Sequence, residues 1–158
     1  MKKLILLTFC ALGFAFQSHG QEIADNALGL RMGDSNGFGI EISYQNALGG
    51  NNRMEFDLGW SDSDNFDAFK LVGLYQWVMN IDGGFNWYVG AGAGVGSVSH
   101  NDNDSDDDGF FALVAGDVGI EYNFDFPLLI SLDFRPEIGI NYPDDVGFDI
   151  ALGLRYQF

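Results

Sequence analysis

The sequence predicts an all-β chain that closes into an eight-stranded antiparallel up-and-down barrel. Three observations predict it: bulky apolar residues alternate with small or polar ones in run after run, turn residues separate the runs, and no helical periodicity competes. The 158 residues include 22 glycines, three prolines and 15% aromatic residues, a composition that suits many strands joined by turns. One domain is the natural size for this length.

The first twenty residues predict a cleavable secretory signal peptide. Lys2 and Lys3 precede the apolar run 4–16, and small residues follow at 18–20. Cleavage after Gly20 would leave 21–158 as the barrel domain.

The only cysteine, Cys10, lies in that apolar run. Acylation of Cys10 is the alternative, and it is disfavoured because Phe9 is too large for the usual lipoprotein signal. The barrel domain then has no thiol for a disulfide or a metal.

The charge is strongly acidic. The formal net charge is −16, and without Lys2 and Lys3 the chain has five basic and 23 acidic residues. No basic patch is present to meet phosphates, which argues against a nucleic-acid partner. No later apolar run approaches the roughly 18 residues that a spanning helix needs.

The last run, 146–158, shows the pattern most clearly. Strict alternation over its thirteen residues indicates a strand with two unlike faces, longer than the five or six residues typical of a soluble strand. Its apolar face is Val146, Phe148, Ile150, Leu152, Leu154, Tyr156 and Phe158.

Four strands are predicted before the middle of the chain. The runs 27–33, 38–45 and 53–60 place a bulky apolar residue at every second position. They end at DSNG (34–37), LGGNN (48–52) and SDSDN (61–65). The fourth run, 66–78, is the least regular, and we assign Phe69, Leu71, Gly73, Tyr75 and Trp77 to its apolar face.

Three further strands are predicted at 85–98, 110–122 and 128–140, separated by turn-forming or acidic residues. The first of them has an apolar face and, opposite it, a ladder of glycines: Gly90, Gly92, Gly94 and Gly96. Pro136 falls inside the third. A closed barrel has no edge on which to lose a hydrogen-bond donor, so we expect a bulge or the strand's exit from the membrane there.

One face of the eight runs carries no charge, and the other carries thirteen charged residues. These are Arg31, Glu41, Arg53, Glu55, Asp57, Lys70, Asp117, Glu121, Asp133, Arg135, Glu137, Asp149 and Arg155. Side chains only just fill an eight-stranded barrel, so the bulky apolar set would overfill it, whereas glycine, alanine, serine and a few paired charges fit. The apolar face therefore points outward, which is tolerable only in lipid, and lipid requires a closed sheet.

Aromatic residues predict two girdles around an aliphatic band. One girdle comprises Tyr44, Tyr75, Trp77, Phe85, Trp87, Tyr122, Tyr156 and Phe158. The other comprises Phe38, Trp60, Phe69, Phe110 and Phe148.

The eight alternating runs and the terminal Tyr156-Gln157-Phe158 resemble the small eight-stranded bacterial outer-membrane barrels, such as the transmembrane domain of outer membrane protein A. The resemblance implies an outer-membrane location with both termini periplasmic after export. It implies lipid and lipopolysaccharide as neighbours, and an assembly machinery that recognises Tyr156 and Phe158 as an assembly signal. The outer loops are short, unlike the protruding strands of adhesin-like members. A monomer is the expectation.

The lumen charges predict the role of the barrel. Isolated buried charge is costly, so these residues should pair into a network that plugs the lumen. Arg135 between Asp133 and Glu137, and Arg53 beside Glu55, indicate parts of it. The prediction is a structural or surface-interaction barrel; the alternative is a narrow cation-preferring pore, favoured by the acidic excess and the glycine ladder.

The acidic stretch 101–109 contains a candidate metal site. Asp104, Asp106 and Asp108 reproduce the start of a D-x-D-x-D-G calcium loop, but the twelfth position holds Ala115 in place of the bidentate glutamate. The alternative is a solvated surface loop. No other cofactor is indicated.

A lipid-modifying enzyme is a second alternative for the function. His100 is the only histidine after the signal peptide, with Ser97 and Ser99 nearby. Both serines alternate with His100 to the opposite face of the strand, and no GxSxG motif is present. The sequence therefore predicts that the protein is not an enzyme.

Overall fold

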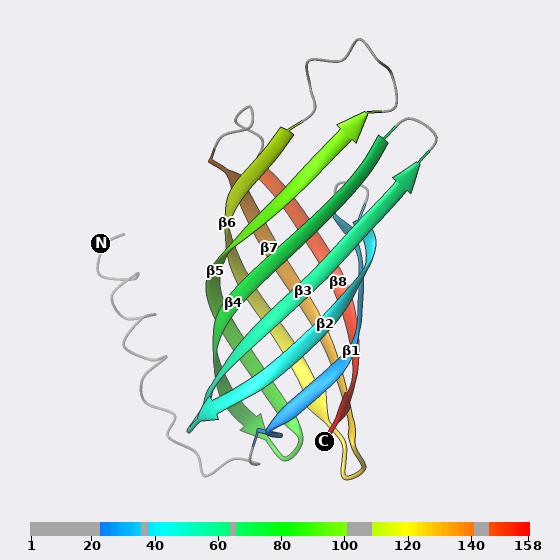
Figure 1. The fold of residues 1–158 in the computed structure, drawn as a ribbon. Helices are drawn as coiled ribbons and strands as arrows, with labels where there is room; N and C mark the ends of the chain where they lie inside the picture. Colours follow the sequence, from blue (N-terminus) through cyan, green and yellow to red (C-terminus); the bar gives the residue numbers. More distant parts are fainter. Residues whose placement is uncertain (1–22, 36–37, 64–65, 101–108, 141–145) are drawn as a thin grey trace, which may run out of the picture.

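The structure, a computed structural model, describes residues 23–35, 38–63, 66–100, 109–140 and 146–158. They form eight strands: β1 (Asn26–Ser35), β2 (Phe38–Gly49), β3 (Asn52–Ser63), β4 (Phe66–Asp82), β5 (Phe85–His100), β6 (Gly109–Asn123), β7 (Leu128–Gly139) and β8 (Val146–Gln157). Each strand pairs antiparallel with the next, and β1 pairs with β8 (Figure 1). The predicted closed up-and-down barrel is confirmed. Within the described part of the chain, no helix is long and apolar enough to cross a membrane.

Two connections are tight turns that depend on glycine. Between β2 and β3, Gly49 and Gly50 have φ angles of 98° and 61°, and between β4 and β5, Gly83 has a φ of 54°. Glycine adopts this left-handed backbone without the steric cost that other residues meet. The strands consequently run closer to the turns than predicted, since β2 extends to Gly49 and β4 to Asp82.

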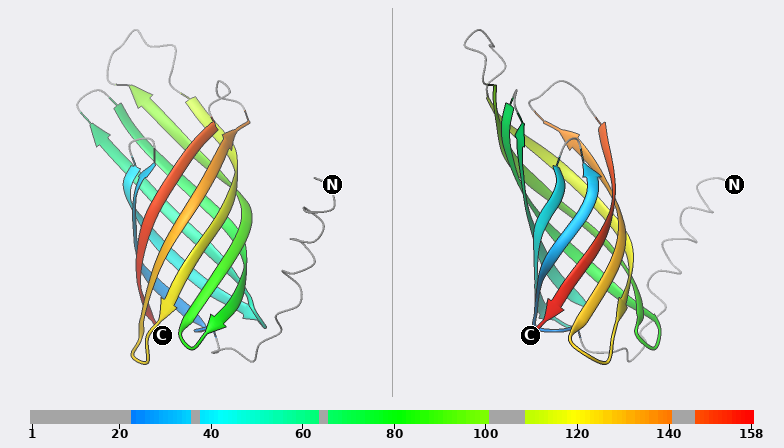
Figure 2. Two further views of the ribbon diagram at one scale, coloured as in Figure 1. Left: turned by 180° about the vertical axis from the view of Figure 1, so that it is seen from behind. Right: turned by 90° about the vertical axis from the view of Figure 1, so that its right-hand side faces the viewer.

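The two ends of the barrel differ. The start of β1, the end of β8 and the turns β2–β3, β4–β5 and β6–β7 share one end, which we call the C-terminal rim (Figures 1 and 2). At the other end, the loop rim, β3 to β6 continue past the remaining strands (Figure 1). β4 and β5 have 17 and 16 residues, against 10 for β1. The sequence analysis expected short outer loops and did not predict this extension of the strands.

Side chains alternate between the outer wall and the lumen. On β8, Ile150 is 65% exposed and Asp149 is 2% exposed. On β3, Phe56 is exposed and Asp57 is fully buried. The bulky apolar face points outward, as the volume argument predicts, and the charged face points into the lumen.

Pro136 does not mark a bulge, so that part of the expectation is wrong, while the alternative, the strand's exit from the membrane, stays a prediction. β7 continues through it to Gly139, and Pro136 pairs with Phe148 of β8 in an unbroken register. On the β6 side, the pairs Ala115–Glu137 and Val118–Phe134 keep one register across the gap between them. Proline lacks the N–H that a ladder bond needs, so pairing lapses locally without shifting the strands.

The lumen also holds an apolar cluster that the sequence reasoning did not predict. Val72 and Leu74 of β4 pack with Leu113 and Ala115 of β6, and Phe111 lies against them. The glycine ladder of β5 makes room for this cluster. A Cβ added to Gly94 would lie 3.0 Å from Val72 Cγ2 and 3.1 Å from Leu113 Cδ1, so neighbouring side chains fill the space beside the ladder.

Replacing Gly92 with alanine should destabilise the barrel by roughly 1–3 kcal/mol, because the added Cβ would overlap the backbone of Gly73 on the paired strand. The urea midpoint of the refolded protein measures the effect. Gly39→Ala is the matched control, since its nearest new contact is 3.9 Å away. Equal midpoints for both variants would contradict the close approach of β4 and β5.

Candidate functional site

All thirteen charged residues predicted for the lumen are buried there, and none is more than 6% exposed. We call them the lumen charge network. Every strand except β5 contributes to it, and β5 carries no aspartate, glutamate, lysine or arginine. These side chains point inward because a strand with a period of two sends every second side chain to the same face.

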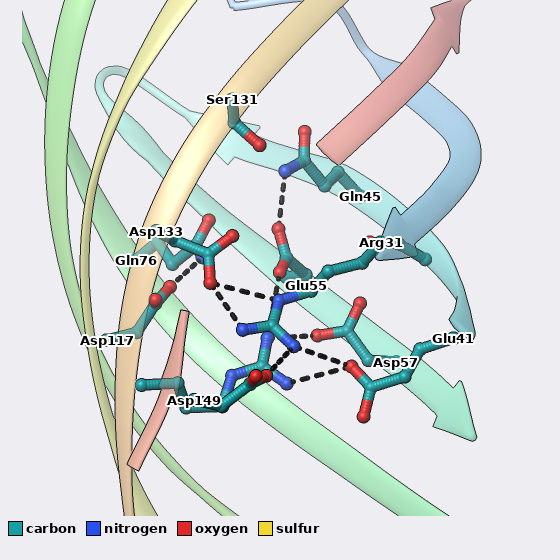
Figure 3. A network of polar contacts seen from close by, with 12 residues as sticks. Arg31, Glu41, Gln45, Glu55, Asp57, Gln76, Asp117, Ser131, Asp133 and Asp149 are labelled. Carbon is teal, nitrogen blue, oxygen red and sulfur yellow. Dashed lines mark hydrogen bonds and ion pairs between the residues drawn. The ribbon is translucent and has the colours of Figure 1, made fainter. Parts of the chain in front are cut away.

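Two arginines, Arg31 and Arg135, form the centre of the lumen charge network, and Figure 3 shows Arg31 among the carboxylates around it. Arg31 Nη1 lies 2.9 Å from Glu41 Oε2 and 2.5 Å from Asp149 Oδ2, and Arg31 also pairs with Asp133. Arg135 is fully buried and pairs with three carboxylates. Its guanidinium lies 3.3 Å from both Glu41 and Glu55, and it also pairs with Asp57. Such charge-assisted, multidentate contacts are the geometry in which guanidinium groups bind most strongly.

Glu55 and Glu41 connect two more cations to this centre. Arg155 Nη2 lies 3.2 Å from Glu55 Oε2, and the same guanidinium donates hydrogen bonds to Ser43 and Ser131. Lys70 Nζ lies 3.0 Å from Glu137 Oε1 and 3.4 Å from Glu41 Oε1.

A branch nearer the C-terminal rim runs through Gln76. Arg53 Nη2 lies 2.7 Å from Glu121 Oε2, and its guanidinium carbon lies 4.9 Å from the centre of the Tyr88 ring. Arg53 Nε donates to Gln76 Oε1 at 2.6 Å, and Gln76 Nε2 donates to Asp117 Oδ2 at 2.5 Å. The amide of Gln76 therefore connects an arginine to a carboxylate.

The ion pairs do not join neighbours on one strand. The flanking residues of Arg135 pair elsewhere, Asp133 with Arg31 and Glu137 with Lys70. Likewise, Arg53 pairs with Glu121 of β6. Alternate residues on a strand project side by side, whereas a long arginine side chain in a narrow barrel reaches strands across the lumen.

Several uncharged polar residues complete the network, and the sequence reasoning missed them. They are Ser43, Gln45, Gln76, Asn86, Tyr88 and Ser131, all buried. Gln45, for example, donates to Glu55 at 2.5 Å. Their parity is the signal that could have found them, because Ser43 lies two residues from Glu41 and Ser131 two residues from Asp133.

Of the remaining predicted site residues, the structure describes Tyr156 and Phe158, which are exposed at the end of the chain. Tyr156 and Phe158 are 60% and 62% exposed, and their rings stack with centroids 6.4 Å apart. Asp104, Asp106 and Asp108 fall outside the described residues, as does the side chain of His100. Among the residues described, no group of three or more histidine, cysteine, aspartate or glutamate side chains could hold a metal ion.

Comparison with known proteins finds likeness in structure only. No family model and no curated protein matches the chain. The N-terminal β-barrel domain of Pseudomonas aeruginosa OprF superposes with a TM-score of 0.71 at 13% identity, covering 85% of this chain and 98% of that one.

Two other solved barrels are similar. Neisserial surface protein A gives a TM-score of 0.60 at 15% identity, over 84% of this chain and 94% of that one. Ail, the attachment invasion locus protein of Yersinia pestis, gives 0.58 at 14% identity, over 86% and 100%. At these identities the likeness shows the fold, and the predicted resemblance to small eight-stranded outer-membrane barrels is confirmed at that level.

Replacing Arg135 with methionine should destabilise the barrel by about 3–5 kcal/mol, because the change leaves buried carboxylates without their shared cation. Equilibrium urea unfolding of the refolded protein measures it. Asp125→Asn, in the exposed β6–β7 turn, should change the free energy of unfolding by no more than about 0.5 kcal/mol. If the Arg135 variant matched this control, the lumen ion pairs would contribute nothing to stability.

Proposed function

We propose that the protein is an integral outer-membrane β-barrel with a structural or surface-interaction role, whose lumen is plugged by the lumen charge network. The observation that carries the proposal is the inversion of polarity across the wall. Thirteen charged side chains are buried inside, while large apolar side chains are exposed outside. An arrangement of this kind is stable when lipid surrounds the barrel.

The outer wall supports a position in a bilayer. Its middle band consists of exposed aliphatic side chains, among them Leu30, Ile42, Leu71, Val114, Leu132 and Leu152. Closure of the sheet pairs every strand with a neighbour on each side, as hydrocarbon requires. Near the C-terminal rim, aromatic rings contact one another, with the centroids of Phe85 and Tyr122 4.5 Å apart. Such rings suit the boundary between lipid and water.

The charged side chains outside the lumen indicate how the protein can contact lipopolysaccharide. From residue 21 onward, all five lysines and arginines lie in the lumen, so the exterior offers acidic side chains and no lysine or arginine. We therefore propose that contact with anionic lipopolysaccharide occurs through bound cations. Exposed Tyr156 and Phe158 support the proposal that the assembly machinery binds this end of β8.

Surface interaction is the less specific part of the proposal. One similar structure is a surface protein and another an attachment invasion locus protein, but a shared fold does not transfer a role. The extension of β3 to β6 beyond the loop rim supports a surface role on its own (Figure 1). We propose no catalytic function, because Ser97 and Ser99 alternate with inward positions and belong to the outer face of β5.

Two layers support a plug over the alternative of a cation-preferring pore. The first is the lumen charge network, whose cations each contact carboxylates on other strands. The second is the apolar cluster around Leu74 and Leu113, which offers permeating ions no polar groups. The glycine ladder favoured a pore because it leaves space in the lumen. The side chains of Gln76, Val72 and Leu113 fill that space.

In planar bilayers, the purified protein should give no reproducible single-channel steps, because both layers block the lumen. A known porin in the same bilayers is the positive control. Faster gel migration of the unboiled sample should verify that the barrel is closed, since a closed barrel resists detergent until heated. Regular cation-selective steps from a closed barrel would contradict the plug and favour the pore.

A further inference from the structure

Asp117 differs from the seven other carboxylates of the lumen charge network. Each of those seven forms an ion pair with an arginine or lysine. Within the described chain, Asp117 forms none, although it is only 4% exposed. Its Oδ2 accepts the hydrogen bond from Gln76, and its Oδ1 has no hydrogen-bond partner.

The groups around Asp117 do not supply the missing charge. Gln76 on β4 is neutral, and Glu55 on β3 and Asp133 on β7 are acidic. Arg135 on β7 is a cation that acts on it, but its guanidinium pairs with Glu41, Glu55 and Asp57. An unpaired carboxylate in such surroundings keeps the full cost of leaving water.

Two further buried oxygen atoms without a hydrogen-bond partner belong to the next inward row of the sheet, two residues along β6 from Asp117. Tyr88 of β5, Gly119 of β6 and Asp133 of β7 form one row across three strands. The Tyr88 hydroxyl lies over Gly119, 2.5 Å from where a Cβ would stand, and this hydroxyl has no hydrogen-bond partner. Asp133 Oδ2 also lacks one. Asp117 Oδ1 and Asp133 Oδ2 are therefore buried acceptors without a donor, and the Tyr88 hydroxyl has its own proton but no acceptor.

We propose that Asp117, with Asp133 and Tyr88, forms an internal proton-binding site, and that Asp117 is a neutral carboxylic acid in the folded barrel at neutral pH. The proton resides on Asp117 Oδ1, the carboxylate oxygen that has no hydrogen-bond partner. The unfolded chain carries Asp117 as a carboxylate, so folding takes one proton from the solution. The inference rests on the proposed plugged lumen, because a water-filled lumen would solvate the carboxylate.

The charge balance of the lumen supports uptake of a proton. Five basic and eight acidic side chains would leave three negative charges in excess if all were ionised. Protonation of Asp117 removes one of these charges at the position where no cation compensates it.

Asp117→Asn tests the site, because asparagine imitates a carboxylic acid in shape and charge and still accepts from Gln76. In the wild type, the folded-to-unfolded ratio should fall tenfold per pH unit relative to the variant, from about pH 5 upward until the folded site ionises. The sign follows because the folded state binds a proton that the unfolded state releases. Urea unfolding at a series of pH values measures the ratio. Asp125→Asn should follow the wild-type profile.

Infrared spectroscopy provides a second, independent readout. Wild-type protein with isotope-labelled aspartate should show the carbonyl stretch of a protonated carboxylic acid at pH 7, and Asp117→Asn should lose that band. Absence of the band, an unchanged pH profile in the variant, or failure of the variant to fold would each overturn the proposal. Failure to fold counts against it because a neutral isostere should fit the site.

Conductance of the same preparations separates the two proposals. A silent wild type without the pH difference would refute the proton site alone. A conducting wild type would refute the plug, and it should then also lack the band and the pH difference, because water in the lumen would solvate Asp117.

Discussion

The pairing of β1 with β8 joins the ends of the sheet, from Ala27–Gln157 to Gly33–Ala151, and the other features depend on it. Without this seam, the backbone groups of both strands would need water, and no part of the sheet could lie in hydrocarbon. The β1–β8 pairing also encloses a lumen. Arg31 of β1 and Asp149 of β8 pair in the lumen only because their strands are neighbours there.

The width of the lumen determines which side chains can occupy it. An eight-stranded barrel has room for side chains and little else, so the charges that enter it must compensate one another. Arginine suits this space because one planar group can serve three carboxylates, as Arg31 and Arg135 do. The bare glycine positions of β5 give space to the side chains of β4 and β6. Paired charges therefore fill one part of the lumen, and the side chains packed beside the glycines fill another.

The fold could be predicted from the sequence because strand alternation is a local property. The thirteen residues 146–158 are enough to show it, and the inward position of Asp133 or Glu55 follows from parity alone. The partners could not be predicted. Arg135 and Asp57 are 78 residues apart, and which carboxylate a long side chain reaches depends on barrel tilt and closure.

Other features were hidden for different reasons. Tyr88 and Leu74 occupy inward positions, yet as bulky residues they look like members of an outer face, so only neighbouring glycines such as Gly119 indicate the space they fill. Pro136 suggested a bulge because proline cannot donate a ladder bond. The structure instead accommodates the loss in place, beside Gly116.

The central claim is that apolar side chains face lipid while charged side chains face the lumen. A single-cysteine scan from Phe148 to Arg155 along β8 tests it most directly, because the only native cysteine, Cys10, lies in the predicted signal peptide. In lipid vesicles, a lipid-soluble maleimide should label positions 148, 150, 152 and 154 and leave 149, 151, 153 and 155 unlabelled. Labelling of the odd positions, or labelling without alternation, would contradict the account.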